Sequence, residues 1–423
     1  MSRLMATAAT VSVHRKREDC RGCGGRNLTR FLSLGPTALA NSFLRSPEEF
    51  RDEARFPLDV YFCRDCSLTQ LLDVIHPEVL FRHYIYVTGT SDTIARHNRE
   101  YARTITGLLH LSSSDLVVEV ASNDGSLLTC FRDLGIRTLG IEPASNIVQI
   151  ARSRGIDTMN EFFCSAMARK VRETYGPARA VIANNVLAHV DDICDFLSGA
   201  RTLIGEEGLI ITEFPYAGEF LDRLEYDTVY HEHLCYFSVT SILRMFERAG
   251  LAILRIDSVA VHGGSLRVYA GRWERNGGHA ESVQAMAREE RSRGLTDFAR
   301  YEEFGEKTAA NRQAVRDLLC RLQSEGRSVA GYGAPAKGNT LLNYCGIDTS
   351  LVPYTVDKNP LKVGAYTPGT HIPVLPVETL LERQPDYVLI LAWNFADEIM
   401  EQQREYRQRG GRFIVPIPAP RVV

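Results

Sequence analysis

Long apolar runs and blocks of like charge are both missing from this sequence. No stretch approaches the roughly 18 consecutive apolar residues that span a bilayer, so we expect no membrane association. Lys and Arg number 49 against 52 Asp and Glu, which gives a net charge of −3, and no Lys/Arg-rich tract is present. Non-specific nucleic-acid binding depends on counterion release by a basic surface. We therefore expect no nucleic-acid partner.

The first 19 residues contain no strong apolar segment of the kind that a signal peptide requires. They include a charged run from His14 to Glu18, and we interpret residues 1–19 as a flexible tail. We expect the protein to lie in the cytoplasm and to be a monomer. With 44% hydrophobic and 24% charged residues the composition is typical of globular proteins, and the length of 423 residues predicts two or three folded units.

A disulfide framework is not expected in a cytoplasmic chain, so the ten cysteines are interpreted as thiols and metal ligands. Four of them form two C-x-x-C pairs separated by 39 residues, Cys20 with Cys23 and Cys63 with Cys66. Two such pairs can place four thiolates at the corners of a tetrahedron, the coordination that structural zinc prefers. Four protein ligands leave no open position, so the pattern predicts structural and not catalytic Zn²⁺. The alternatives are thiol redox chemistry and coincidence.

After residue 115, apolar runs alternate with helical stretches, which is typical of a parallel α/β sheet. The expected strands of this series include 116–120, 138–142, 180–184 and 208–213. A second series begins at Ser328, with expected strands at 329–333, 353–357, 387–392 and 412–416. We therefore predict an α/β protein in which the tail is followed by three parts. These are a four-Cys zinc-binding N-terminal module (20–90), a Rossmann-like domain (91–275), and a helical linker with a second Rossmann-like domain (276–423).

The turn after the first strand of the central domain lacks the glycines of a dinucleotide site. A pyrophosphate normally needs G-x-G-x-x-G, whereas Gly125 is the only glycine in Glu119-Val-Ala-Ser-Asn-Asp-Gly125. The turn favours a nucleoside that carries an amino acid, with the acids and Asn123 around its ammonium group and Glu142 accepting its ribose hydroxyls. A purely structural turn is the alternative, since many Rossmann-like units end strands in acids. The candidate cofactor-binding residues are Glu119, Ser122, Asn123, Asp124, Gly125, Glu142 and Asn184.

The run Tyr230-His-Glu-His233 lies in an aromatic-rich insertion at 215–237 that interrupts the α/β pattern. It contains groups able to act as general acid or base near neutral pH. If the run is extended, alternation places Tyr230 and Glu232 on one side and both histidines on the other. The run lacks the H-E-x-x-H spacing of a zinc protease, so a catalytic metal is not expected. His189, beyond a strand end, should lie on the same rim of the sheet, and a non-catalytic polar loop is the alternative.

The Gly-rich turn Gly331-Tyr-Gly333-Ala-Pro-Ala-Lys337-Gly338-Asn339 resembles a P-loop in spacing only. Asn339 replaces the lysine that a P-loop requires, so ATP hydrolysis is not expected. A Gly-rich strand-to-helix turn with Lys337 at the helix start still suits a diphosphate. We therefore nominate Lys337, Asn339 and Asp357, which ends the next strand, as substrate-binding residues. A tight turn in a structural Rossmann-like unit is the alternative.

Taken together, these segments resemble the nucleotide-sugar C-methyltransferases of antibiotic deoxysugar pathways. The resemblance covers nearly the whole chain after the tail, and its motifs stand in one order along the sequence. They are the two C-x-x-C pairs, Leu34-Gly35-Pro36, Ala40-Asn41, Tyr86-Val-Thr-Gly-Thr90, Glu119 to Gly125, Tyr230 to His233, His262-Gly-Gly-Ser-Leu-Arg267 and Gly331 to Lys337.

The resemblance implies S-adenosylmethionine as methyl donor and a dTDP-linked 4-keto-6-deoxyhexose as substrate, methylated at carbon 3. It also implies a zinc-bearing N-terminal domain, a central class I methyltransferase domain and a C-terminal domain that helps to bind the sugar nucleotide. Carried over by position, the site consists of Tyr86, His189, Tyr230, Glu232 and His233. A carbon beside a ketone loses its proton when a base is at hand and the enolate is stabilised. We expect His233 to be the base, Glu232 to orient it or hold a sugar substituent, and both tyrosines to donate to the oxyanion.

Three other functions fit parts of the sequence. An O-methyltransferase acting on a sugar or polyketide hydroxyl would use the same donor site. A zinc-stabilised protein that binds nucleotides without turnover would not need the clustered acid and bases at 230–233. An NAD-dependent sugar oxidoreductase is disfavoured by the missing glycines around Asn123.

Overall fold

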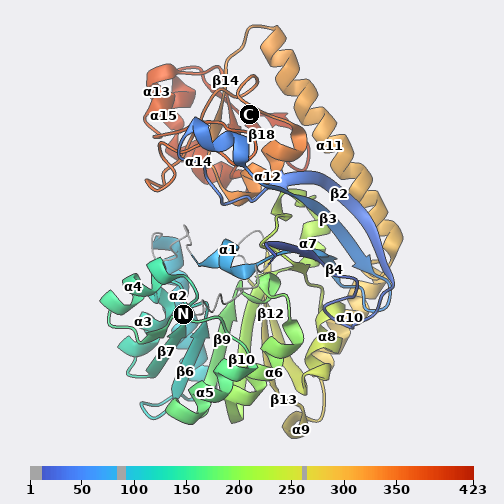
Figure 1. Cartoon of the computed structure of the whole chain (residues 1–423), viewed down its shortest axis with the longest axis vertical. Coiled ribbons are helices and arrows are strands. Elements are labelled where there is room, and N and C mark those ends of the chain that lie inside the picture. The colour runs from blue at the N-terminus through green and yellow to red at the C-terminus, as the bar shows by residue number, and fades with distance from the viewer. Residues whose placement is uncertain (1–11, 83–91, 260–263) are drawn as a thin grey trace, which may run out of the picture.

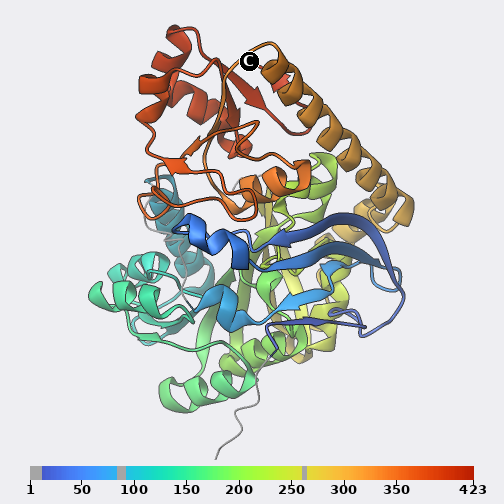
Figure 2. The same ribbon diagram turned by 45° about the horizontal axis from the view of Figure 1, so that its top comes forward.

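The computed structural model describes residues 12–82, 92–259 and 264–423, which form three parts (Figure 1). In that view a C-terminal α/β domain lies at the top, a central α/β domain lies at the bottom, and strands of an N-terminal module lie between them. The long helix α11 (Phe298–Ser324) runs along one side and leads into the C-terminal domain. Figure 2 shows the blue strands of the module in the same middle position after rotation. The predicted α/β architecture with a four-Cys N-terminal module is confirmed.

The N-terminal module is built on an antiparallel sheet that includes a strand from the central domain. Its elements are β1 (His14–Lys16), β2 (Leu28–Ala38), η1 (Pro47–Asp52), β3 (Arg55–Cys63), β4 (Thr69–Leu71), β5 (Asp73–Ile75) and α1 (Pro77–Phe81). The four-stranded sheet has the order β11-β4-β3-β2, and β11 (Cys235–Tyr236) belongs to the insertion of the central domain. Cys235 pairs with Gln70, and Tyr236 pairs with Thr69. The module and the insertion therefore share one sheet.

Part of the predicted flexible tail is a β-strand. Strand β1 pairs with β5 in antiparallel orientation, with His14 opposite Ile75. The buried carboxylate of Asp73 lies 2.9 Å from the ring of His14 and 3.6 Å from the ammonium group of Lys16. The prediction that residues 1–19 form a flexible tail is therefore wrong for this strand, because a buried acid far along the chain provides a partner for its basic residues.

The central domain has a seven-stranded sheet with the order β12-β13-β10-β9-β6-β7-β8. Its strands are β6 (Leu116–Val120), β7 (Arg137–Ile141), β8 (Thr158–Met159), β9 (Ala178–Asn184), β10 (Ile204–Pro215), β12 (Leu251–Val259) and β13 (Ser265–Arg272). Its helices are α2 (Asp92–Leu109), α3 (Ser126–Asp133), α4 (Ser145–Ser153), α5 (Ser165–Tyr175), η3 (Leu187–His189), α6 (Ile193–Leu203), α7 (Ala217–Asp222), η4 (Tyr226–Thr228) and α8 (Val239–Arg248). Strands β6 to β10 are parallel, and β12 and β13 extend one edge in antiparallel pairing. All of β6 is buried because both faces of the sheet are covered, which explains why its sequence hardly alternates.

The loops at the carboxyl ends of the parallel strands are tightly wound. Ala121, Asn123 and Gly125 after β6 have φ angles of 51°, 50° and 72°, and Asn185 after β9 has φ of 55°. Non-glycine residues rarely adopt this left-handed region, and such backbone strain gathers at functional sites. Ligands of open α/β sheets bind at this same edge. The strained turns therefore mark the edge of the sheet where a site is expected.

The C-terminal domain contains a six-stranded sheet with the order β16-β15-β14-β17-β18-β19. Its strands are β14 (Val329–Tyr332), β15 (Thr355–Val356), β16 (Val374–Leu375), β17 (Tyr387–Ile390), β18 (Arg412–Val415) and β19 (Arg421–Val422). Its helices are α12 (Ala336–Cys345), α13 (Thr379–Arg383), η5 (Trp393–Phe395), α14 (Ala396–Gln402) and α15 (Arg404–Gln408), and α9 (Trp273–Asn276) and α10 (Glu281–Ser292) precede α11. All neighbouring strands are parallel except β19.

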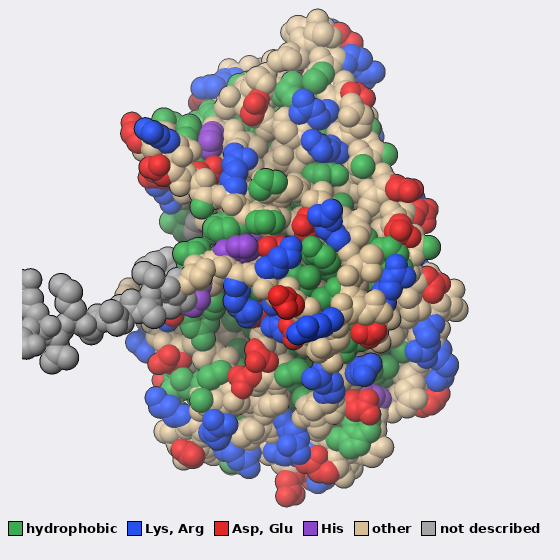
Figure 3. Space-filling model, turned by 45° about the vertical axis from the view of Figure 1, so that its right-hand side comes forward, with side chains coloured by type: hydrophobic (Ala, Val, Ile, Leu, Met, Phe, Trp, Pro, Cys, Tyr) green, Lys and Arg blue, Asp and Glu red, His purple; other side chains and the backbone are tan. Residues whose placement is uncertain are grey.

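One buried hydrophobic cluster runs through all three parts, from Cys20 in the module to Ile417 in the C-terminal domain. On the surface, acidic and basic side chains are interspersed over the face seen in Figure 3, with hydrophobic side chains between them. No helix in the described ranges has the length and apolar character needed to cross a membrane. The shared core means that the parts position one another.

Helix α12, which follows the Gly-rich turn, packs against the N-terminal module and the insertion. Asn339 is fully buried, and its Nδ2 donates to the backbone carbonyl of Ala40 at 2.7 Å. The ammonium group of Lys337 lies 3.7 Å from the carboxylate of Glu225, and Asp357 accepts a 2.7 Å hydrogen bond from a backbone N–H of the turn itself. These contacts join the domains and close the turn, whereas a contact with a diphosphate stays a prediction.

Replacing Asn339 by Ala should lower the melting temperature, because the buried carbonyl of Ala40 loses its donor at a cost of about 1–3 kcal/mol. Asn276→Ala, which removes an exposed amide bonded to the nearby backbone carbonyl of Arg272, is the matched control and should leave the melting temperature nearly unchanged. Thermal melting and dTDP binding would be measured for both variants. An Asn339→Ala protein with normal melting and weakened dTDP binding would show that this amide contacts the nucleotide instead.

Candidate active site and metal centre

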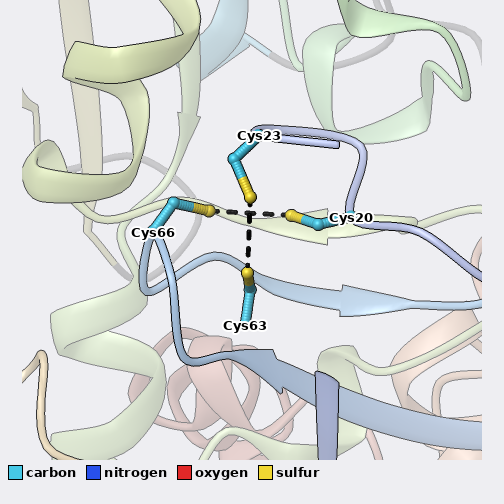
Figure 4. A group of neighbouring side chains, drawn as sticks. All are labelled: Cys20, Cys23, Cys63 and Cys66. Carbon is cyan, nitrogen blue, oxygen red and sulfur yellow. Dashed lines mark hydrogen bonds between the residues drawn. The ribbon is translucent and has the colours of Figure 1, made fainter. Parts of the chain in front are cut away.

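The four paired cysteines of the N-terminal module converge on one point (Figure 4). The Sγ atoms of Cys20 and Cys66 are 3.6 Å apart, as are those of Cys23 and Cys63, and all four sulfur atoms lie within 4.8 Å of one another. Zn–S bonds of about 2.3 Å in a tetrahedron place neighbouring sulfurs about 3.8 Å apart, so the cluster fits a zinc ion. The predicted metal ligands are therefore brought together.

Hydrogen-bond donors of the module point at these sulfur atoms. Gln70 Nε2 lies 3.0 Å from the Sγ of Cys20, and the N–H of Gly25 donates to the Sγ of Cys23 at 3.3 Å. Such donors stabilise thiolates and fix their orientation around a metal. With all four positions occupied by protein sulfur, zinc held here would be structural.

The turn after β6 contains buried polar atoms without partners. Among the described residues, Oε2 of Glu119 and Oγ of Ser122 are buried and make no hydrogen bond. Burial raises the pKa of Glu119 well above its usual range, and repulsion from Asp124 and Glu142 raises it further. A cation beside this carboxylate would relieve both penalties, so the turn fits the ammonium group of an amino-acid nucleoside.

Glu142, immediately after β7, points at the same turn. Its carboxylate accepts hydrogen bonds from the backbone N–H groups of Asn123 at 2.9 Å and Ala144 at 2.8 Å. Burial raises the pKa of Glu142, and these two hydrogen bonds oppose that shift. The acid is thus fixed at the strand end where Rossmann-like folds recognise ribose hydroxyls. Its contact with the donor stays a prediction.

Two other nominated residues at this edge have partners within the protein. Asp124 is fully buried, and its carboxylate pairs with Arg154 at 2.7 Å and accepts hydrogen bonds from Ser126. The side chain of Asn184, at the end of β9, accepts a 3.3 Å hydrogen bond from the hydroxyl of Tyr101. Asp124 therefore shapes the turn that Gly125 ends, and its predicted contact with an ammonium group is untested.

The run at 230–233 forms a tight turn and is not extended. The N–H of His233 donates to the carbonyl of Tyr230 at 2.8 Å, which brings their side chains together. The alternation expected for an extended run, with Tyr230 beside Glu232 and both histidines opposite, is therefore wrong. The cause is His231, whose buried Nε2 lies 3.3 and 3.1 Å from two backbone carbonyls of β3 and so faces the N-terminal module.

Both ring nitrogens of His233 have defined partners. Nδ1 lies 2.9 Å from the backbone carbonyl of Thr228, which can only accept, so Nδ1 carries the proton. Nε2 lies 2.6 Å from the hydroxyl of Tyr230, which donates to it. In this tautomer the Nε2 lone pair lies beside a phenol donor.

His189 packs against this pair from the end of η3. Its ring meets the His233 ring edge to face, with centroids 4.9 Å apart and an interplanar angle of 81°. Burial lowers the pKa of His189 to about 4, although a hydrogen bond to the backbone of Glu232 opposes the shift. His189 is consequently neutral near pH 7 and does not add positive charge beside His233.

The N-terminal module also reaches the turn through Asn41. Its Nδ2 donates to the buried carboxylate of Glu232 at 2.7 Å. Four of the five nominated residues are thus brought together around 230–233, and Tyr86 lies outside the described residues. Sequence reasoning did not assign Asn41 a role, although it belongs to one of the motifs that carried the resemblance.

A buried ion pair at the neighbouring strand ends was not predicted from the sequence. Glu213 near the end of β10 pairs with Arg267 of β13, and His97 lies 3.8 Å from the same carboxylate. The guanidinium group of Arg267 lies over the ring of Tyr101, 4.1 Å from its centre. Arg267 ends the segment that begins at His262, which was the one signal available in the sequence. Glu213 and Tyr101 belong to no motif.

Comparison with known proteins gives matches along the whole chain. Three family models match: a proposed zinc-binding domain at residues 20–81, a methyltransferase domain at residues 94–256, and a C-methyltransferase C-terminal domain at residues 260–418. C-methyltransferase NovU of Streptomyces niveus is 38% identical over 406 residues, which cover 96% of this chain and 97% of that protein. Among solved structures, magnesium protoporphyrin IX methyltransferase from Synechocystis PCC 6803 with bound S-adenosylmethionine is 15% identical with a TM-score of 0.33, over 44% of this chain and 88% of that chain. The mitomycin 7-O-methyltransferase MmcR is 16% identical with a TM-score of 0.33, over 43% and 54%.

Identity of 38% over nearly the whole of both chains shows that this chain belongs to the C-methyltransferase family. It is a C-methyltransferase with a zinc-binding N-terminal domain. The predictions of this family, of an enzyme and of a zinc-binding module are confirmed, and S-adenosylmethionine as its methyl donor stays a prediction.

Replacing Glu142 by Ala should weaken binding of S-adenosylmethionine about tenfold or more, because hydrogen bonds to a charged acceptor contribute roughly 1.5–3 kcal/mol. Binding would be measured by calorimetry, with Asp133→Ala, an exposed acid at the end of α3, as the control. Equal affinity of Glu142→Ala and wild type would show that the ribose is not bound at the end of β7.

Proposed function

We propose that this C-methyltransferase acts on carbon 3 of a dTDP-linked 4-keto-6-deoxyhexose. The observation that carries the proposal is the pairing of His233 Nε2 with the Tyr230 hydroxyl at 2.6 Å. A ketone presents its oxygen and its α-proton side by side, so enolisation needs a hydrogen-bond donor and a base side by side. O-methylation of a hydroxyl needs the base but no donor to an oxyanion. The geometry therefore supports O-methylation less well than C-methylation.

In this proposal His233 is the base. Nε2 removes the proton from the carbon beside the ketone, while Nδ1 keeps its proton and donates it to the Thr228 carbonyl, a hydrogen bond that stabilises the imidazolium that forms. The Tyr230 hydroxyl turns from Nε2 to the sugar oxygen, where it stabilises the enolate. From its place in the motif, we assign Tyr86 as a second hydrogen-bond donor to this oxygen. The neutral ring of His189 covers one side of the imidazole and keeps water from it.

We assign Glu232 to substrate binding. Asn41 holds its carboxylate, which leaves the acid able to orient the sugar or bind a substituent on it. We assign the sugar diphosphate to the Gly-rich turn of the C-terminal domain, near Lys337 and Asp357. Asn339 supports that turn by its contact with Ala40.

The donor is assigned to the turn after β6. S-adenosylmethionine, when bound, supplies a methyl group that its positively charged sulfur already activates for transfer to carbon. Glu119 and Ser122 offer unpartnered buried oxygens for its ammonium group, and Glu142 offers its carboxylate to the ribose. Asn123, Asp124, Gly125 and Asn184 complete the set that we propose. We place the reaction in the cytoplasm, where cysteines stay reduced, and assign it to a monomer.

Replacing His233 by Asn should abolish both methyl transfer and deuterium wash-in at the acidic carbon, because a general base contributes roughly a hundred- to ten-thousandfold in rate. Sugar-nucleotide binding should be nearly unchanged, since the base acts on the transition state. Tyr230→Phe keeps the base and should be milder, and His279→Asn, on the remote α9–α10 connection, should match wild type. Product mass, NMR position of the new methyl group and wash-in in deuterated buffer would be measured with a dTDP-4-keto-6-deoxy sugar.

Other outcomes would reassign the roles. Wash-in that survives His233→Asn but is lost in His189→Asn would make His189 the base, and loss only in Glu232→Gln would make the carboxylate the base. A wild-type protein that transfers methyl to this sugar class without any wash-in, giving a methyl group on oxygen, would contradict the proposed reaction.

A further inference from the structure

Three arginine side chains of the N-terminal module converge on one carboxylate of the central domain. Arg17 and Arg21 lie 3.2 and 3.1 Å from Oδ1 of Asp191, and Arg15 pairs with Oδ2. Arg17 also donates to the backbone carbonyl of Asp191 at 3.4 Å. This is the densest set of charged contacts between the module and the loop that follows η3.

Arg21 is the buried member of the set, and residues next to the metal ligands hold it in place. Its side chain is 0% exposed, and it directly follows the metal ligand Cys20. Its guanidinium group donates to the carbonyl of Leu71 in β4, and its backbone N–H donates to Gln70 Oε1 at 3.1 Å. Gln70 in turn contacts the Sγ of Cys20. A buried guanidinium is costly unless it is paired, so the position of Asp191 opposite Arg21 is tightly defined.

Asp191 stands two residues after His189, in a loop that is hydrogen-bonded to the segment directly following the 230–233 turn. The carbonyl of Ala188 accepts a 2.7 Å hydrogen bond from the N–H of Leu234, directly after His233. The N–H of Leu71, whose carbonyl binds Arg21, donates to the carbonyl of Leu234 at 2.9 Å. The guanidinium of Arg21 therefore lies between the metal ligands on one side and the segments that bear both histidines on the other.

We propose that Arg21 and Asp191 are positioning residues for methyl transfer: their partly buried ion pair sets His189, and through it the ring of His233, relative to the metal-binding module. The proposal rests on the proposed function, since it takes the roles of the two histidines from there. Neither residue touches the substrate in this account. A pair that only joined two domains would affect melting, whereas a positioning pair affects the rate at temperatures where the protein is fully folded.

The test compares two carboxylates that are each shared by arginines. Asp191→Asn removes the charge opposite Arg21 and keeps the side-chain shape. Asp222→Asn is the matched control, because Asp222 pairs with Arg293 and Arg300 on the surface. Arg21→Lys keeps the charge but loses the planar fork, and Asp191→Glu restores the charge and serves as the rescue variant.

Five quantities would be measured for each folded variant: zinc content, binding of S-adenosylmethionine, kcat and KM for the dTDP-4-keto-6-deoxy sugar, and the ring resonance of His189 in ¹³Cε1-histidine-labelled protein. Asp191→Asn and Arg21→Lys should lower kcat about ten- to a hundredfold, the scale expected for misplacing a catalytic group by about 1 Å. KM, donor binding and zinc content should stay near wild type, and the His189 resonance should shift. Asp191→Glu should recover part of kcat, and Asp222→Asn should match wild type throughout.

Unchanged kcat in Asp191→Asn would overturn the inference, whether or not the His189 resonance moves, and so would an equal loss in Asp222→Asn. If Asp191→Asn does not fold, Arg21→Lys and Asp191→Glu decide by the same criteria. His233→Asn in the same assay separates the two hypotheses: full activity of that variant contradicts the proposed function, whereas an inactive His233→Asn beside a fully active Asp191→Asn contradicts only the positioning pair.

Discussion

The antiparallel pairing of β11 with β4 is the constraint on which the rest of the site depends. It places two residues of the central domain in the sheet of the N-terminal module, immediately after the turn that carries Tyr230 and His233. His231 reinforces the pairing, because its ring bonds to backbone carbonyls of β3. The turn is therefore defined by a module that lies more than 150 residues earlier in the sequence.

In the proposed mechanism, the metal-binding module contributes to catalysis without taking part in the chemistry. Its four cysteines fit a structural zinc ion, and the same module supplies Asn41 to Glu232 and Phe81 to the edge of His189. In the same proposal the donor site is separate: we assign it to the carboxyl edge of the central sheet, where burial raises the pKa values of Glu119 and Glu142. The proposal thus assigns donor binding to one sheet edge and positioning of the base to the sheet that the module and the insertion share.

Much of the fold could be predicted from the sequence, because local patterns decide it. Strand β6 begins and ends where its apolar run does, and the spacing of the C-x-x-C pairs predicted the four-sulfur cluster. The turn at 230–233 and strand β1 could not be predicted in the same way. His231 faces β3 and the basic residues of β1 face Asp73, and both partners are distant in the sequence. Asn339 carried a binding-site pattern, yet its burial against Ala40 is decided by domain packing.

Hydrogen exchange with and without zinc tests the central claim most directly. If the module holds the catalytic turn through the β4–β11 pairing, removing the metal with a chelator should expose the amides of residues 69–71 and 235–236 to exchange together, because metal binding is coupled to folding of the module. The amides of β6 at 116–120, which pair only within the central sheet, should keep their protection. Protection of 235–236 that persists while 69–71 exchange freely would contradict the account.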